Sequence, residues 1–240
     1  MGSTAINISI VMPAYNEELN IRSATLQNME TFSALGLDYE IIIVNDFSSD
    51  KTGEIADELA GKWSEVRSFH HKQNQGVGGA FKTGIAHAKK NYIIFIPCDN
   101  PMTCEDLQAY LPRVDVCDIV VGVRVERLGY STFARVASFV YNRIMIPLLF
   151  NIGLADVNWI QVYRRSHFED GTLAFENSNI FFLVEILVQA RKNKLIIVEV
   201  PSRMALRMHG KATSARFSVV WATFLDAMKF FIKINKRPKL

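Results

Sequence analysis

Acidic residues that directly follow apolar runs are the first candidates for chemistry in this chain. Asp99 comes shortly after the run 92–96, and Asp46 comes shortly after the run 40–44. If these runs are buried strands of an open α/β sheet, both carboxylates leave the sheet where its ligands bind. A carboxylate there can hold a divalent cation or a ligand hydroxyl. Taken alone, each acid is equally well explained as a turn residue, because Asp commonly caps turns.

A glycine run lies between these two acids. Gly76 and Gly78 follow Asn74 and precede a helical pattern. They match the first two glycines of a dinucleotide-binding loop, but the third position is Phe81 and a polar segment precedes the run. A pair of glycines is weak support for nucleotide binding. The run alone therefore predicts a turn before a helix.

The elements around these residues alternate between strands and helices. Strands are expected over 6–12, 40–44, 66–70, 92–96, 118–123 and 195–200, with a strand pair or a loop and strand within 156–165. Helices are expected over 16–32 with Asn16 as N-cap, from about 103, and over 51–63, 76–90, 131–150 and 181–192. Such alternation is typical of an α/β fold with a mostly parallel central sheet flanked by helices.

The charge of the chain is distributed unevenly. From Arg203 onward there are nine Lys and Arg residues and one acid, a net charge of +8, whereas the preceding part carries 18 basic and 23 acidic residues, a net charge of −5. A basic end favours an anionic partner, either phosphate, nucleic acid or a lipid surface. Nucleic acid is the weakest of these, because no alternation of aromatic and basic residues typical of a binding sheet is present.

The last helical segment has two interpretations. Between Phe217 and Ile234 the apolar residues form a helical stripe, and lysines lie on the other face. The stripe either docks on the core or lies among lipid head groups with its lysines toward anionic lipid. Its many aromatic residues slightly favour the lipid interface. We therefore divide the chain into an α/β domain, residues 1–210, and a basic amphipathic helix and tail, residues 211–240.

Composition indicates a cytoplasmic location. No run of about 18 or more uncharged apolar residues is present, so no transmembrane helix is predicted. The first residues lack the basic and apolar regions of a signal peptide. Cys98, Cys104 and Cys117 are odd in number and lack C-x-x-C spacing, which favours reduced thiols.

Five segments together resemble the family 2 glycosyltransferases, and within them the polyprenyl-phosphate sugar synthases of the dolichyl-phosphate mannose synthase type. The segments are Pro13–Glu18, Val44–Thr52, Asn74–Ala80 with Gly84 and Ala88, Asp156–Arg165, and Arg207–Lys211. They occur in the family's order, and the resemblance runs from Ile8 to about Thr213.

The resemblance implies a GT-A-type nucleotide-diphospho-sugar transferase fold and an inverting transferase that moves a sugar from a UDP- or GDP-linked donor to a polyprenyl phosphate. For substrate binding it implies Pro13, Tyr15, Glu17, Asp46, Ser48, Gly76, Gly78, Lys82, Arg124 and Arg135. For catalysis it implies Asp99, Asp156, Arg207 and Lys211, with Mg2+ or Mn2+ held by Asp99 and Asn100. The expected location is peripheral, at the cytoplasmic face of a membrane, and a homo-oligomer is left open.

Two departures from the family pattern keep other functions open. The family's D-x-D-x-Q metal motif falls on residues 97–101, where Pro97 replaces the first Asp and Asp99 remains. In the V-D-D-G-S motif, Asn45 replaces the first acid and Phe47 replaces the glycine. Transfer to a saccharide or another small acceptor, and donor binding without turnover, therefore remain alternatives.

Overall fold

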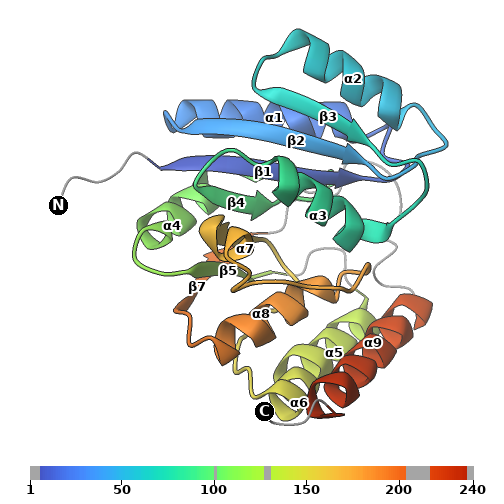
Figure 1. The fold of residues 1–240 in the computed structure, drawn as a ribbon, viewed down its shortest axis with the longest axis vertical. Coiled ribbons are helices and arrows are strands. Elements are labelled where there is room, and N and C mark those ends of the chain that lie inside the picture. The colour runs from blue at the N-terminus through green and yellow to red at the C-terminus, as the bar shows by residue number, and fades with distance from the viewer. Residues whose placement is uncertain (1–5, 100–101, 127–130, 204–216, 237–240) are drawn as a thin grey trace.

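A computed structural model describes residues 6–99, 102–126, 131–203 and 217–236 of the chain. Figure 1 shows a sheet with helices on both faces and a helical group beyond one side of it. The strands are β1 (Asn7–Ala14), β2 (Asp38–Asn45), β3 (Val66–His70), β4 (Tyr92–Phe95), β5 (Ile119–Arg124), β6 (Gln161–Arg164) and β7 (Ile197–Ser202). The helices are α1 (Ile21–Ala34), α2 (Thr52–Lys62), α3 (Gly76–His87), α4 (Cys104–Val114), α5 (Thr132–Val140), α6 (Ile146–Phe150), α7 (Ser166–Glu169), α8 (Phe182–Lys192) and α9 (Phe217–Lys236), with a π-helical turn η1 (Tyr141–Met145) between α5 and α6.

The described strands form one sheet in the order β3-β2-β1-β4-β6-β5-β7. β6 runs antiparallel to its neighbours β4 and β5, and the other described pairs are parallel. The register pairs Ala14 with Asn45, so β1 and β2 end at the same level. The loops that follow the parallel strands therefore meet at one edge, which we call the carboxyl edge. The opposite edge is the amino edge. The predicted mostly parallel sheet is confirmed.

Successive residues of the central strands are buried on opposite faces of the sheet. In β1, Ile10 packs in a cluster with Phe32 of α1 and Leu107 of α4. Its neighbour Val11 packs in a second cluster with Phe81 of α3 and residues of α8. Burial on both faces explains why these strands are continuous apolar runs in the sequence.

The start of the first helix differs from its prediction. Asn16 is not an N-cap, because α1 begins only at Ile21. Asn16 has a φ of 54°, and its Oδ1 accepts a hydrogen bond from the amide of Ser49 at 2.9 Å. Asn adopts this left-handed region more readily than most residues. The side chain that was expected to start a helix therefore joins two loops.

One continuous helix over residues 132–150 comprises α5, η1 and α6. It is long and apolar enough to cross a membrane by length and composition, with a mean hydropathy of 1.3 and 22% of its window buried. The sequence predicted a helix over 131–150 but no membrane span, because Arg135 and Arg143 interrupt the apolar run. Of the residues in this helix, Phe133, Val136, Phe139, Val140, Ile144 and Leu148 are large apolar side chains that are exposed.

The C-terminal helix α9 docks on the core through one face and leaves other apolar side chains exposed, and its lipid-interface interpretation stays a prediction. Ala227 is buried, and the ring centroid of Phe230 lies 5.7 Å from that of Phe150 at the end of α6, so one face docks on the core. On the other side, Trp221 and Ile232 are exposed. In Figure 1, α9 lies beside α5 and α6. The predicted boundary at residues 210 and 211 falls outside the described residues and stays a prediction.

Candidate functional site

Hydrogen bonds join the loops after β1 and β2 at the carboxyl edge. The amide of Asp46 donates to the carbonyl oxygen of Ala14 at 2.9 Å, and the amide of Asn16 donates to Ser48 Oγ at 3.0 Å. Each loop thus supplies partners to the other, and the two form one surface. Tyr15, a predicted substrate-binding residue, lies exposed between these two contacts.

The same surface continues toward the end of β4. The amide of Glu17 donates to Thr52 Oγ1 at 2.8 Å, and Glu17 Oε2 accepts from Asn20 Nδ2 at 2.7 Å. The thiol of Cys98 donates to the carbonyl oxygen of Pro13 at 3.4 Å. Segments that are 85 residues apart in the sequence are thereby held together at the carboxyl edge.

Asp46 organises a third loop rather than pointing freely toward solvent. It is 3% exposed, and its Oδ1 lies 2.6 Å from His71 Nδ1 and accepts from the amide of Gln75 at 2.8 Å. The other ring nitrogen of His71 lies 2.8 Å from Thr83 Oγ1 on α3. Asp46 therefore ties the end of β2 to the start of α3. His71 was missed as a site residue, although it follows β3 directly.

Asn45 shows how the chain accommodates the loss of an acid from the V-D-D-G-S pattern. Its Oδ1 accepts from the amide of Ser48 at 3.1 Å, and its Nδ2 lies 3.0 Å from His70 Nδ1. The second nitrogen of His70 lies 2.8 Å from Asp57 Oδ1. A neutral side chain with a donor and an acceptor fits both neighbours, so the loop keeps its shape without this carboxylate.

Gly76 and Gly78 have a packing role in the structure. A Cβ at Gly78 would lie 2.2 Å from the carbonyl oxygen of Asn177, and one at Gly76 would lie 2.5 Å from that of Ser178. Gly76 also has a φ of +75°. The amide of Gly78 donates to the carbonyl oxygen of Ser178 at 2.8 Å. The predicted substrate-binding role is not favoured, because this N–H and the surrounding space are taken by the 177–178 segment.

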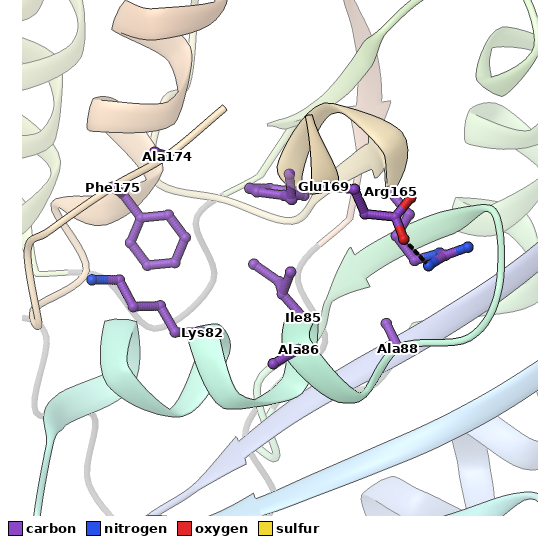
Figure 2. Close-up of a pocket in the computed structure, with 9 residues that line it drawn as sticks. Lys82, Ile85, Ala86, Ala88, Arg165, Glu169, Ala174 and Phe175 are labelled. Carbon is purple, nitrogen blue, oxygen red and sulfur yellow. Dashed lines mark hydrogen bonds and ion pairs between the residues drawn. The ribbon is translucent and has the colours of Figure 1, made fainter. Parts of the chain in front are cut away.

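Lys82 lies apart from the other predicted site residues. It lines a hollow of about 390 Å³ together with residues of α3, α7 and the 174–175 segment (Figure 2). Its Nζ lies 5.1 Å from the ring centroid of Phe175, and Arg165 forms an ion pair with Glu169 across the same hollow. The amide of Arg165 donates to the carbonyl oxygen of Asn91, just before β4. The hollow thus reaches the amino edge, and its position argues against donor binding by Lys82.

Asp99 follows β4 at the carboxyl edge and is half-buried. Burial raises the pKa of the neighbouring Cys98 thiol, and the charges of Glu17 and Asp99 add to this effect. The thiol therefore stays protonated at neutral pH. Asp99 is left as the carboxylate of this segment.

The side chains present fit a cation that arrives with a diphosphate better than a preformed metal site. Within the described ranges, no group of three or more His, Cys, Asp or Glu side chains could hold a metal ion. Mg2+ is commonly bound by one or two carboxylates together with substrate phosphates. Asp99 is sufficient for that arrangement. Asn100, the second predicted ligand, lies outside the described residues.

Arg124 and Asp156 form a buried bidentate ion pair after β5. Arg124 Nε donates to Asp156 Oδ2 at 2.6 Å, and Nη2 donates to Oδ1 at 2.7 Å. The side chains are 7% and 0% exposed. The guanidinium carbon also lies 4.8 Å from the ring centroid of Trp159. Phosphate binding by Arg124 and base catalysis by Asp156 are not favoured, because each occupies the other and neither faces solvent.

The remaining predicted cations are not part of the described edge. Arg135 is exposed on α5. Arg207 and Lys211 lie outside the residues that the structure describes. The structure brings together the predicted residues Pro13, Tyr15, Glu17, Asp46, Ser48 and Asp99.

Comparison with known proteins adds the family. The sequence profile described as "Glycosyl transferase family 2" matches residues 9–172, which is more than half of the chain. A curated relative, glycosyltransferase AglD of Haloferax volcanii, is 28% identical over 207 residues, covering 83% of this chain and 33% of that protein. The chain thus spans about a third of the length of this relative.

Solved glycosyltransferase structures share the fold at low sequence identity. Glucosyl-3-phosphoglycerate synthase from Mycobacterium tuberculosis, in complex with Mn2+, uridine-diphosphate and phosphoglyceric acid, has a TM-score of 0.69 at 21% identity, covering 92% of this chain and 78% of that one. Mannosyl-3-phosphoglycerate synthase from Rubrobacter xylanophilus has a TM-score of 0.71 at 13% identity, covering 98% and 76%. The predicted GT-A-type fold is confirmed. From the matched profile and this fold, the chain belongs to glycosyl transferase family 2.

Proposed function

We propose that this chain is an inverting glycosyltransferase that moves a sugar from a UDP- or GDP-linked donor to a polyprenyl phosphate. The observation that carries the proposal is the joined surface at the carboxyl edge, where the loops with Tyr15 and Asp46 meet the segment of Asp99. Ligands of open α/β sheets bind beyond this edge. The nucleoside of the donor would lie on the β1 and β2 loops, and its diphosphate would point toward Asp99.

Stabilisation of the leaving diphosphate is the main chemical demand of this reaction. Negative charge develops on it in the transition state, so positive charge must be placed there in advance. Mg2+ or Mn2+ held by Asp99, with Asn100 as the further expected ligand, would supply Lewis-acid stabilisation. Arg207 would contact phosphate oxygens in a bidentate manner, and Lys211 would act as a point charge.

A phosphate acceptor makes few demands on general base catalysis. A phosphate monoester is already ionised near neutral pH, because its second pKa is about 6. The burial of Asp156 in its ion pair with Arg124 is therefore compatible with transfer to such an acceptor. We assign this pair a positioning role: it holds the segment before β6 at the carboxyl edge.

Exposed apolar helix faces support a membrane-bound acceptor. On α9, Trp221, Leu225 and Ile232 are 54%, 39% and 45% exposed. Their spacing of four and then seven residues places them on one face of the helix. Lys229 and Lys236 are exposed on the same helix, and the 132–150 helix adds further exposed apolar side chains. An apolar surface with lysines beside it fits an anionic membrane, and we place the protein peripherally at the cytoplasmic face.

Vesicle sedimentation tests the membrane part of the proposal. We expect the protein to sediment with vesicles that contain phosphatidylglycerol and much less with phosphatidylcholine alone. The double variant Trp221→Ala, Leu225→Ala should partition at least about a hundredfold more weakly than the wild type, because burial of each side chain contributes about 1.5–3 kcal/mol and about 1.4 kcal/mol corresponds to a factor of ten. Leu26→Ala is the matched control, since Leu26 on α1 is 38% exposed, as Leu225 is 39%. Equal partitioning of both variants would remove this surface from the proposal.

Turnover of a sugar-nucleotide panel tests the reaction itself. Radiolabelled UDP and GDP sugars are incubated with polyprenyl phosphate and Mn2+, and the lipid-linked product is counted. Asp99→Ala should lose about a hundredfold or more in kcat, in line with removal of a group that acts on developing charge. Glu65→Ala, an exposed acid just before β3, should turn over as the wild type does. An unaffected Asp99→Ala enzyme would refute the assignment of Asp99.

Donor binding without turnover is the second candidate, and the single carboxylate at the metal position favours it. Isothermal titration with UDP and GDP sugars, with and without Mn2+, measures binding separately from product formation. Tight binding with no product from polyprenyl phosphate or from a saccharide panel would support this candidate. Product with saccharides alone would instead assign a small acceptor.

A further inference from the structure

Phe47 has a backbone conformation that bulky residues rarely adopt. It directly follows Asp46 at the carboxyl end of β2, and its φ is +63°. This left-handed region places Cβ against the backbone, so glycine is the usual residue and a bulky side chain is an outlier. Phe47 occupies the position of the glycine in the V-D-D-G-S pattern. A persistent outlier of this kind is a reason to look for a function.

The neighbours of Phe47 hold this conformation in place. Before it, Asp46 is buried and bound to His71 and the amide of Gln75. After it, the amide of Ser48 donates to Asn45 Oδ1 at 3.1 Å. The strain is therefore imposed by well-bound residues on both sides.

Packing of the Phe47 ring does not compensate for the strain. The residue is 56% exposed, so its ring lies largely in solvent. A phenyl ring that stabilised the fold would be expected in a buried cluster. Phe81 and Phe182 are examples, since both belong to the buried cluster that packs α3 and α8 on the sheet. The exposed ring is better explained by a ligand than by the fold.

A second aromatic side chain lies on the adjoining loop. Tyr15 is 53% exposed and sits between Ala14 and Asn16. These two residues bond to Asp46 and Ser48, which flank Phe47. Two hydrogen bonds thus bracket Tyr15 and Phe47, so these two exposed residues lie on adjoining loops of the carboxyl edge.

We propose that Phe47 is a donor-binding residue that stacks on the base of the donor nucleotide, beside Tyr15. This inference rests on the proposed function. A base offers a flat π face, and stacking on aromatic side chains is its common mode of binding to proteins. The sugar and the diphosphate of the donor have no such face, so the contribution of Phe47 is confined to the nucleoside. Because Phe47 is 56% exposed, its ring is accessible to a base bound at this edge.

Titration of three variants with UDP, GDP and inorganic pyrophosphate tests the proposal. Phe47→Gly removes both the ring and the strain, Phe47→Leu keeps the strain and the apolar bulk, and Phe47→Tyr keeps the ring. For the nucleotide that the wild type binds more tightly, Kd should rise about tenfold in the Gly and Leu variants, because one stacked base corresponds to roughly that factor. The Tyr variant should stay within about threefold of the wild type, since it retains the stacking face.

Thermal unfolding and pyrophosphate binding separate a ligand role from a structural one. Phe47→Gly should melt at the same temperature as the wild type or higher, and pyrophosphate Kd should be unchanged in all three variants. An unchanged nucleotide Kd in the Gly and Leu variants, with nucleotide binding by the wild type intact, would overturn the stacking role alone. A change confined to the KM of the lipid acceptor would also overturn it. If the wild type bound neither UDP nor GDP, the proposed function would fail first.

Discussion

The two edges of the sheet both carry buried acids, but they use them differently. At the amino edge, Glu40 accepts hydrogen bonds from Ser9 Oγ at 2.7 Å and from the amide of Lys89 at 2.6 Å, and it pairs with Arg67 at 2.6 Å. At the carboxyl edge, Asp46 shares Oδ1 between His71 and a backbone amide. The amino edge thus surrounds its acid with a cation and several donors, whereas the carboxyl edge uses its acid to shape loops that keep Tyr15 and Phe47 exposed. We infer that the amino edge mainly stabilises the fold and the carboxyl edge mainly binds ligands.

Arg124 is the residue most able to break this distinction, because its ion pair with Asp156 lies at the carboxyl edge but resembles the pairs of the amino edge. Arg124→Ala would leave Asp156 buried without its guanidinium partner. We expect the free energy of unfolding to fall by about 3–5 kcal/mol, as for other buried pairs that lose one member. Urea denaturation measures this loss. The double variant Arg124→Met, Asp156→Leu should lose less. A cost below about 1 kcal/mol for the single variant would return Arg124 to the list of ligand-binding residues.

Gly78 at the start of α3 tests whether part of the carboxyl edge also stabilises the fold, with a smaller expected loss of stability than Arg124. In Gly78→Ala the new Cβ would lie 2.2 Å from the carbonyl oxygen of Asn177, and this backbone atom has little freedom to move. We expect a loss of about 1–3 kcal/mol in thermal unfolding from overpacking. Gly61→Ala is the matched control, since nothing lies within 4 Å of its added Cβ on α2. There the change should stabilise the helix by about 0.5–1 kcal/mol. Equal effects at both positions would contradict the packing role of Gly78.

Substitution of Glu40 has the smallest expected effect on stability. The pH dependence of that effect tests whether the charge of Glu40 stabilises the amino edge. Burial acts to raise the pKa of Glu40, but hydrogen bonds from Ser9 and Lys89 and the charge of Arg67 together bring it below its usual value of 4.5. A carboxyl group with a lowered folded-state pKa stabilises the fold above the unfolded pKa, and this stability is lost as pH falls through the lowered value. Glu40→Gln should therefore cost about 1–2 kcal/mol at neutral pH and progressively less below about pH 4. Donor Kd should not change. A pH-independent cost would show that shape, and not charge, explains the role of Glu40.

The sequence predicted the fold and the edge of the sheet at which its first polar clusters lie, because both depend on local patterns. Strands buried on both faces leave continuous apolar runs, and the polar residues that end them mark the carboxyl edge. Asp99 and Asp46 could therefore be placed at this edge without any knowledge of contacts, whereas Tyr15 and Ser48 were implied only by the family resemblance. The helical pattern of residues 131–150 likewise predicted one long helix, which the structure confirms with a π-helical turn inside it.

Pairings between distant residues could not be predicted. Arg124 and Asp156 are 32 residues apart, and the resemblance implied substrate binding for Arg124 and catalysis for Asp156, because nothing in the local sequence shows that they pair with each other. The bond between His71 and Asp46 spans 25 residues in the same way. The resemblance implied substrate binding for Lys82, but a helix turns its residues toward different faces, and Lys82 lines the hollow beside Phe175. The left-handed φ of Phe47 could not be predicted either, because phenylalanine rarely adopts this conformation.

β6 runs antiparallel to its neighbours, so this short strand connects the carboxyl edge with the hollow around Lys82 near the amino edge. The chain enters β6 beside the carboxyl edge and leaves it at Arg165, next to the hollow around Lys82 (Figure 2). Lys82 is exposed beside this hollow, so a fluorophore or an immobilisation linker attached there would sit at the hollow and not on the proposed donor surface. Sensors and supported biocatalysts could be built from this side of the molecule with the substrate face left open.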